Sequence, residues 1–274
     1  MLRLTPEQKI HYTLRLAVAM CFIGHGTFGI ITKAIWCNYF AVFGIGHDLA
    51  YRLMPILGSF DILIGIAMLA YPVRAIPGWL VIWGIVTALL RPLSGEPFAE
   101  FIERAGNFGA PLALLLLSGG GGRTIKGWVT RIDPNTPAND PHSHADAKTL
   151  ARVVICLRLV VFLLLLGHGW LNLIEKKGLI GQYTTLGFPN PAGAAHAVGL
   201  FEIIAACAVL IRPFGPLLLV LLAWKIMSEF FYPHYEVFEW VERGGSYGAI
   251  LALWFATQSL PGLISRNTHI ALSS

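Results

Sequence analysis

Two histidines and two acids stand at matched positions in the two halves of the chain, inside segments that are otherwise apolar. His25 lies between two glycines, as does His168, and the next apolar segments carry Asp61 and Glu202 respectively. An imidazole or a carboxylate within hydrogen-bond distance of a bound group can act as a general base. We therefore expect these four residues to bind a ligand and to move its protons.

A second repeated set lies near the end of each half. Its members are Glu100, Glu103 and Arg104 in the first half and Glu239, Glu242 and Arg243 in the second. The spacing of i, i+3 and i+4 puts each set on one face of a helix. One interpretation is an internal lattice of ion pairs that fixes helix packing, with Glu103 and Arg104 satisfied by Asp61 or His25. The other is a polar pocket in each half, open to the outer side.

The second half carries further polar residues. His168 and Asn172 share one stripe of their helix, and Lys225 and Glu229 are spaced i, i+4 where the first half is apolar. One copy of a duplicated unit usually keeps the chemistry, so we expect the active site in the second half. The catalytic candidates are His168, Glu202 and Glu242. The ligand-binding candidates are His25, Asp61, Glu103, Arg104, Asn172, Lys225, Glu229 and Arg243.

The elements that position these residues are expected to be transmembrane helices. Hydrophobic residues make up 55% of the chain and charged residues 13%, with a mean hydropathy of +0.65, which is far from the composition of a soluble domain. Eight continuous apolar runs lie at 16–35, 55–71, 76–90, 106–117, 153–174, 194–211, 213–231 and 244–257. A spanning helix needs about 20 residues, and barrel strands would alternate instead. The predicted fold class is all-α integral membrane with eight transmembrane helices, the fourth starting near Pro97 and running on without a break.

The matched positions predict two parallel four-helix-bundle repeats. Residues 98–114 align with 237–253, and the spacing of their charged residues and glycines is the same. We expect a first repeat at 1–118, a flexible cytoplasmic linker at 119–150 and a second repeat at 151–274. An even number of helices per repeat makes the repeats parallel.

The distribution of Lys and Arg predicts the orientation. More of them fall in the segments on the side of the N-terminus, so both termini are expected in the cytoplasm. This topology accounts for the net charge of +5, so the expected partner is the lipid bilayer and no nucleic acid is needed.

The glycines beside each histidine allow two interpretations. Small residues let two helices cross closely, or they leave room for a planar ligand with the histidine as its contact. Because the repeat relates His25 to His168, the two could also face each other and ligate a haem b. No other metal site is expected. The four cysteines form no Cys-x-x-Cys pair, which argues against thiol–disulfide chemistry.

The pattern Leu-Arg-Leu, Gly-His-Gly and Lys, followed by an acid in the second helix of a four-helix unit, resembles the DoxX/DoxD-like membrane proteins. Residues 166–191 (LGHGWLNLIEKKGLIGQYTTLGFPNP) carry the closest similarity. That family includes a subunit similar to that of thiosulfate:quinone oxidoreductase. The resemblance implies a multi-pass protein of the bacterial cytoplasmic (inner) membrane, associated with electron transfer and with quinone as its cofactor.

Three functions follow as hypotheses. The first is a quinone-linked oxidoreductase subunit in which His168, Glu202, Glu242 and Arg243 hold the quinone head group. The second is a non-catalytic accessory subunit that packs against protein partners in a larger respiratory complex. The third, a transporter, ranks last because the sequence shows no pair of discontinuous helices.

Overall fold

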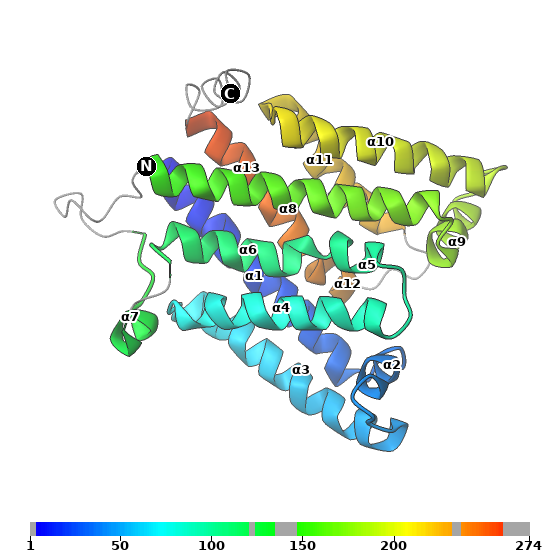
Figure 1. The fold of residues 1–274 in the computed structure, drawn as a ribbon, viewed down its shortest axis with the longest axis horizontal. Coiled ribbons are helices and arrows are strands. Elements are labelled where there is room, and N and C mark those ends of the chain that lie inside the picture. The colour runs from blue at the N-terminus through cyan, green and yellow to red at the C-terminus, as the bar shows by residue number, and fades with distance from the viewer. Residues whose placement is uncertain (1–3, 121–123, 135–146, 232–236, 260–274) are drawn as a thin grey trace, which may run out of the picture.

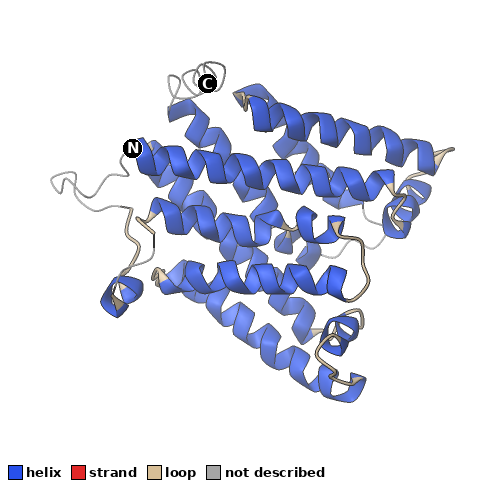
Figure 2. Cartoon of the chain, viewed as in Figure 1, coloured by secondary structure: helices blue, strands red, loops and turns tan. Residues whose placement is uncertain are grey.

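The computed structural model describes residues 4–120, 124–134, 147–231 and 237–259, and these form a bundle of helices (Figures 1 and 2). Apart from one isolated bridge between Val73 and Arg131, the described residues contain no β-structure. In chain order the α-helices are α1 (Pro6–Ile30), α2 (Trp36–Ala41), α3 (His47–Ala70), α4 (Ala75–Leu93), α5 (Ala99–Glu103), α6 (Ala105–Leu117), α7 (Ile125–Val129), α8 (Ala147–Leu173), α9 (Lys177–Thr185), α10 (Pro191–Ile211), α11 (Gly215–Ser228), α12 (Val237–Glu242) and α13 (Gly244–Ser259).

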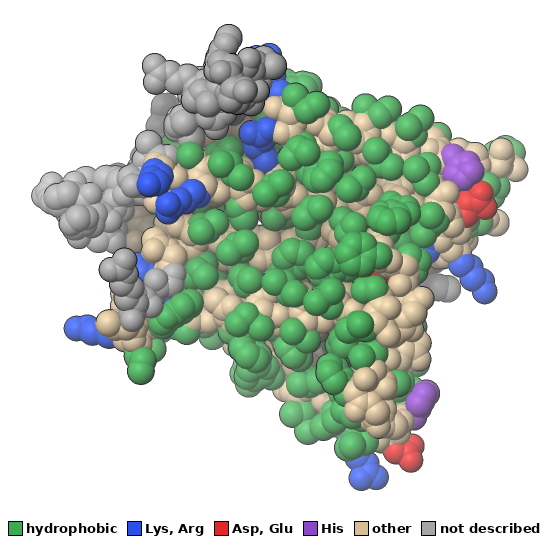
Figure 3. All heavy atoms as spheres, in the orientation of Figure 1, with side chains coloured by type: hydrophobic (Ala, Val, Ile, Leu, Met, Phe, Trp, Pro, Cys, Tyr) green, Lys and Arg blue, Asp and Glu red, His purple; other side chains and the backbone are tan. Residues whose placement is uncertain are grey.

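Five of these helices, α1, α3, α4, α8 and α10, are long and apolar enough to cross a membrane. α6 and α11 are apolar but shorter. Figure 3 shows hydrophobic side chains over the middle of one face, with charged side chains gathered toward two opposite ends. Large apolar side chains such as Ile56, Leu63 and Ile204 are exposed along these helices, and a lipid environment would cover them. The expectation of a helical membrane protein is thus confirmed in this part of the chain.

Glycines set how closely the first two long helices of each half approach. A Cβ atom on Gly26 or Gly29 of α1 would meet the backbone of α3 around Gly58. In the second half, a Cβ on Gly169 of α8 would lie 2.8 Å from the carbonyl oxygen of Gly199 in α10. The interpretation of Gly-His-Gly as a tight crossing is therefore confirmed for both histidines.

The last helices of each half pack against the first helix of the other half. Gly24 of α1 contacts the backbone of Glu242 in α12, and Gly167 of α8 contacts the backbone of Glu103 in α5. The main core lies between α1, α6, α8 and α13, where Leu14, Leu114 and Leu157 are fully buried. Each half therefore packs its first helix against the last helices of the other half.

The prediction of a continuous fourth helix from Pro97 is wrong. The helix is interrupted at Arg104, which has φ −88° and ψ 17° and separates α5 from α6. A matching interruption at Arg243 separates α12 from α13. The turn at each arginine lets the short helix bring its acids beside the first helix of the other half, where the glycine allows close contact.

Part of the predicted linker is held against the bundle. The side chain of Thr124 caps α7 by accepting from the amide of Gly127 at 3.3 Å. The guanidinium of Arg74 donates to the carbonyl oxygen of Gly127 at 3.4 Å, and the amide of Ile132 donates to the carbonyl oxygen of Pro72 at 2.8 Å. The rest of the linker, 121–123 and 135–146, lies outside the described residues.

Candidate functional site

His25 and Asp61 form the centre of the first-half site. Nδ1 of His25 lies 2.8 Å from Oδ2 of Asp61, which is fully buried. The pairing arises because the glycines of α1 bring that helix against α3. A charge at this depth is costly unless it is paired, so each residue compensates the other. Nε2, the other ring nitrogen of His25, makes no hydrogen bond to the described residues.

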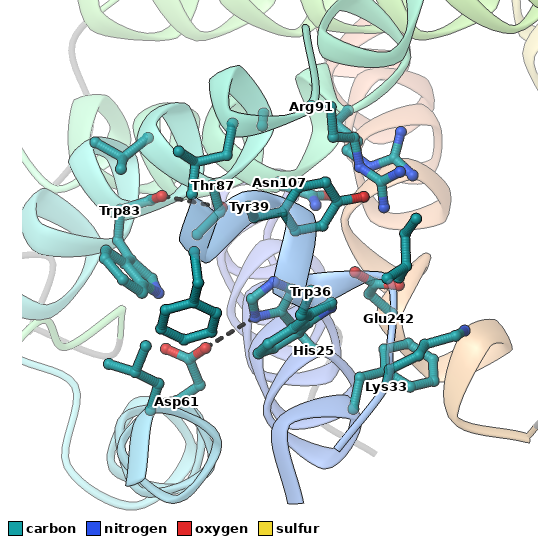
Figure 4. A pocket seen from close by; sticks show the side chains of 18 of the residues that line it. His25, Lys33, Trp36, Tyr39, Asp61, Trp83, Thr87, Arg91, Asn107 and Glu242 are labelled. Atoms are coloured by element: carbon teal, nitrogen blue, oxygen red, sulfur yellow. Dashed lines mark hydrogen bonds and ion pairs between the residues drawn. The ribbon is translucent and has the colours of Figure 1, made fainter. Parts of the chain in front are cut away.

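This pair lines a cavity of about 530 Å³ (Figure 4). Its wall is largely aromatic and apolar; Lys33, Arg91 and Glu242 lie on one side of it, and Asp61 lies apart from them (Figure 4). The ring of His25 lies against Trp36, with centroids 4.7 Å apart and planes tilted by 32°. Further lining residues include Phe28, Lys33, Tyr39, Phe40, Phe43, Leu57, Trp83, Thr87, Ala88, Arg91, Arg104, Asn107, Lys176, Glu239, Glu242 and Arg243. The volume is within the range of small-ligand sites, roughly 300–1,000 Å³.

Tyr39 lines this cavity and is held in place by Glu96. The hydroxyl of Tyr39 donates to Oε1 of Glu96 at 2.6 Å, and Oε2 of Glu96 pairs with Arg91 at 3.0 Å. Burial raises the pKa of the Tyr39 phenol, so the phenol stays protonated and keeps donating.

Glu103 is the centre of an ion-pair network beside the cavity. Its carboxylate pairs with Arg104 at 2.8 Å and also with Arg243, which comes from the other half. Glu100 joins the network through Arg104 at 2.6 Å and through Lys176. The lattice of ion pairs considered from the sequence is therefore present. Its partners are the two arginines and Lys176, and not Asp61 or His25.

Glu242 differs from its counterpart Glu103. Both arginines of the network, Arg104 and Arg243, form ion pairs with Glu103. Among the described residues, Glu242 makes no ion pair or hydrogen bond, and it lines the first-half cavity with His25 (Figure 4). The cavity thus holds a carboxylate that makes no direct ion pair in the described part of the chain, although Arg104 lies near enough to interact with its charge.

The second half repeats the histidine–acid pair in more closed surroundings. Nδ1 of His168 lies 2.5 Å from Oε2 of Glu202, and both residues are buried. Oε1 of Glu202 accepts from the indole nitrogen of Trp224 at 2.8 Å. Asn172 donates to the carbonyl oxygen of His168 at 3.0 Å and accepts from the hydroxyl of Tyr183 at 2.7 Å. The cavity beside His168 is smaller, about 280 Å³.

Lys225 and Glu229 lie in the core of the second half. Nζ of Lys225 lies 3.9 Å from Oε1 of Glu229, and both side chains are buried. Oε2 of Glu229 also lies 3.8 Å from Nε of Arg243. These two residues therefore extend the ion-pair network and do not line the cavity that holds His168.

The structure brings together most of the predicted site residues, but in a different grouping. Glu242 lies beside His25 in the first-half cavity and not with His168 and Glu202, because the last helices of the two halves are exchanged. His25 and His168 line separate cavities. Sequence reasoning missed Trp36, Tyr39 and Trp83. Trp83 could have been predicted, because its spacing from Asp61 equals that of Trp224 from Glu202.

Comparisons with protein-family models, with curated proteins and with solved structures find no match to this chain.

Proposed function

We propose that this protein is a redox-associated membrane subunit that binds a quinone in the first-half cavity. The observation that carries the proposal is His25, whose Nδ1 is fixed by Asp61 in a cavity with aromatic walls. The cavity combines a place for a planar ring, beside Trp36 and Tyr39, with polar groups in its lining. A quinone has the same division between an apolar body and two polar oxygens.

The histidine–acid pair gives the site its proton chemistry. When Asp61 accepts from the Nδ1–H of neutral His25, Nε2 carries the lone pair and can take a proton from a ligand hydroxyl. Asp61 then stabilises the imidazolium that forms, as the buried acid does in other histidine–carboxylate pairs. The bound quinone supplies the electron exchange. Glu242 offers a second acceptor for protons in the same cavity.

The proposal includes eight membrane spans in two parallel four-helix repeats. Matched contacts support it, since Arg15 donates to the last carbonyl groups of α3 and Arg158 donates to those of α10. The broken helices α5–α6 and α12–α13 would each serve as one span. The bias of Lys and Arg supports cytoplasmic termini, and the resemblance to DoxX/DoxD-like proteins supports the bacterial cytoplasmic membrane.

Two alternatives have less support. A bis-histidine haem would need His25 and His168 in one cavity, and they line two. An accessory subunit within a larger electron-transfer complex remains compatible with the exposed apolar helices, but a role of that kind does not require the cavity.

A transporter is the second candidate function. The sequence predicts no discontinuous helices, yet interruptions at Arg104 and Arg243 occur at matched positions in both halves. Such pairs of broken helices mark the substrate site in several transporter folds. Uptake of a labelled quinone analogue into proteoliposomes, compared with empty vesicles, distinguishes transport from binding alone.

The test of the proposed function is a titration of the detergent-purified full chain with a short-chain ubiquinone by isothermal calorimetry. We expect saturable binding that His25→Ala weakens at least tenfold, which corresponds to about 1.4 kcal/mol. His168→Ala is the matched variant in the smaller cavity and should keep most of the affinity. Equal loss in both variants, or no saturable binding to the unaltered protein, would contradict the proposal.

A further inference from the structure

Two tryptophans at equivalent positions differ in what their indole nitrogens meet. Trp224 follows Glu202 by 22 residues and donates to Oε1 of that acid at 2.8 Å. Trp83 follows Asp61 at the same spacing, with the two residues in α3 and α4 where the second half uses α10 and α11. Yet no hydrogen-bond partner for Nε1 of Trp83 exists among the described residues. The second half therefore satisfies this N–H internally and the first half does not.

Asp61 also has a polar atom whose hydrogen-bonding capacity is unused. Its Oδ2 is bonded to His25, but its Oδ1 is buried and has no hydrogen-bond partner in the described part of the chain. In the second half, both oxygens of Glu202 are used, one by His168 and one by Trp224. A buried polar atom without a partner costs about 1–3 kcal/mol. In the described part of the chain, Nε1 of Trp83 is thus an unused donor and Oδ1 of Asp61 an unused acceptor, and both residues line the cavity (Figure 4).

The two acids differ by one methylene group. Glutamate at position 202 is long enough to reach the indole, whereas aspartate at position 61 is shorter. The group that completes the first-half site must accept from an N–H and donate to a carboxylate. A hydroxyl does both through a single oxygen, whereas a carbonyl oxygen only accepts.

We infer that the first-half cavity is built for the hydroxyl of a bound ring, held between Oδ1 of Asp61 and Nε1 of Trp83. This inference rests on the proposed function for the ring and adds a preference between its two redox forms. A quinol carries such hydroxyls and a quinone does not. The site therefore selects the reduced form, and the second half is closed to a ligand of this kind by its own Glu202–Trp224 bond.

A neighbouring position also differs between the open first-half cavity and the closed second half. Ala88 lines the first-half cavity, and the equivalent position in the second half is Glu229, whose buried side chain lies in the ion-pair network. At this position the first half has a small side chain beside the cavity, and the second half has a buried carboxylate.

The test uses the detergent-purified full chain under anaerobic conditions and three probes: decylubiquinol, its dimethyl ether and decylubiquinone. Calorimetry should give at least tenfold tighter binding for the quinol than for the ether or the quinone. Equal affinities for all three, as a water between Asp61 and Trp83 would give, overturn the inference and leave the proposed function standing. Failure of all three to bind overturns both.

Two variants and one control locate the preference for the quinol. Asp61→Glu copies the second half and should close the bond to Trp83, so that quinol affinity falls at least tenfold while ether affinity changes little. Trp83→Phe removes the N–H and should reduce the preference for the quinol over the ether several-fold. Trp224→Phe removes the equivalent N–H in the second half and should keep the full preference. If Asp61→Glu does not fold, Trp83→Phe decides, and an unchanged preference in that variant overturns the inference.

Discussion

Lys33, which follows α1, forms an ion pair with Glu239 of α12, with Nζ 2.6 Å from Oε1. The equivalent pair, Lys176 with Glu100, joins the second half back to the first. Each half therefore supplies the lysine of one pair and the acid of the other. The two pairs differ in burial, because Glu239 is about one-third exposed and Glu100 is fully buried.

This difference in burial predicts unequal stability effects. Glu100→Gln leaves Arg104, Arg91 and Lys176 without their shared counter-charge, so we expect a loss of about 3 kcal/mol in the free energy of unfolding. Lys33→Ala breaks a pair that water screens and should cost less than about 1 kcal/mol. Thermal unfolding in detergent, followed by circular dichroism, gives both values. Similar shifts in the two variants would show that burial does not govern these pairs.

The contact between Gly24 and the backbone of Glu242 predicts a second effect. A methyl group at residue 24 would push α12 from α1, and backbone cannot rotate out of the way as a side chain can. We expect Gly24→Ala to lower the free energy of unfolding by about 1–3 kcal/mol. Gly178→Ala in α9 is the control, because its new methyl group meets nothing within 4 Å and alanine favours a helix. A Gly24→Ala protein that unfolds at the same temperature as the unaltered chain would contradict the packing.

The residue types and spacing were enough to single out the two histidines, the two acids and the clustering of the charged sets, but not the direct pairing of each histidine with its acid. Polar residues in an apolar chain stand out, and in a membrane each must find a partner. The helix break at Arg104 was not predictable from the same spacing. Glu100 lies in the short helix α5 and Arg104 ends it, so the i, i+4 ion pair between them forms whether or not the helix continues beyond Arg104.

The exchange of last helices between the halves could not be read from the alignment. A repeat identifies Glu242 as the equivalent of Glu103, but it does not say whether each packs within its own half or against the other one. The aromatic wall was missed for a different reason. Trp36, Tyr39 and Phe40 are ordinary in an apolar sequence, so only their position around a cavity distinguishes them.

The separation of His25 and His168 into two cavities predicts the optical spectrum of the protein. A bis-histidine haem b gives a sharp α-band in a dithionite-reduced minus oxidised spectrum. We expect a flat spectrum from the detergent-purified chain, because each histidine is turned to its own acid through Nδ1. A sharp α-band that disappears in His25→Ala would contradict this and make haem the cofactor.

The placement of α7 and of the start of α3 at opposite ends of the bundle (Figure 1) predicts how the chain is oriented in the membrane. Lys126→Cys in α7 and Asp48→Cys in α3 each put a thiol on an exposed residue. A Cys207→Ala background removes the native cysteine that is exposed. In intact cells, a membrane-impermeant maleimide should label residue 48 and spare residue 126, since the Lys and Arg bias puts α7 in the cytoplasm. Detergent-solubilised protein should be labelled at both positions, which shows that each thiol is reactive. Labelling of residue 126 alone in intact cells would reverse the proposed topology, and would put the first-half cavity in the cytoplasmic half of the membrane.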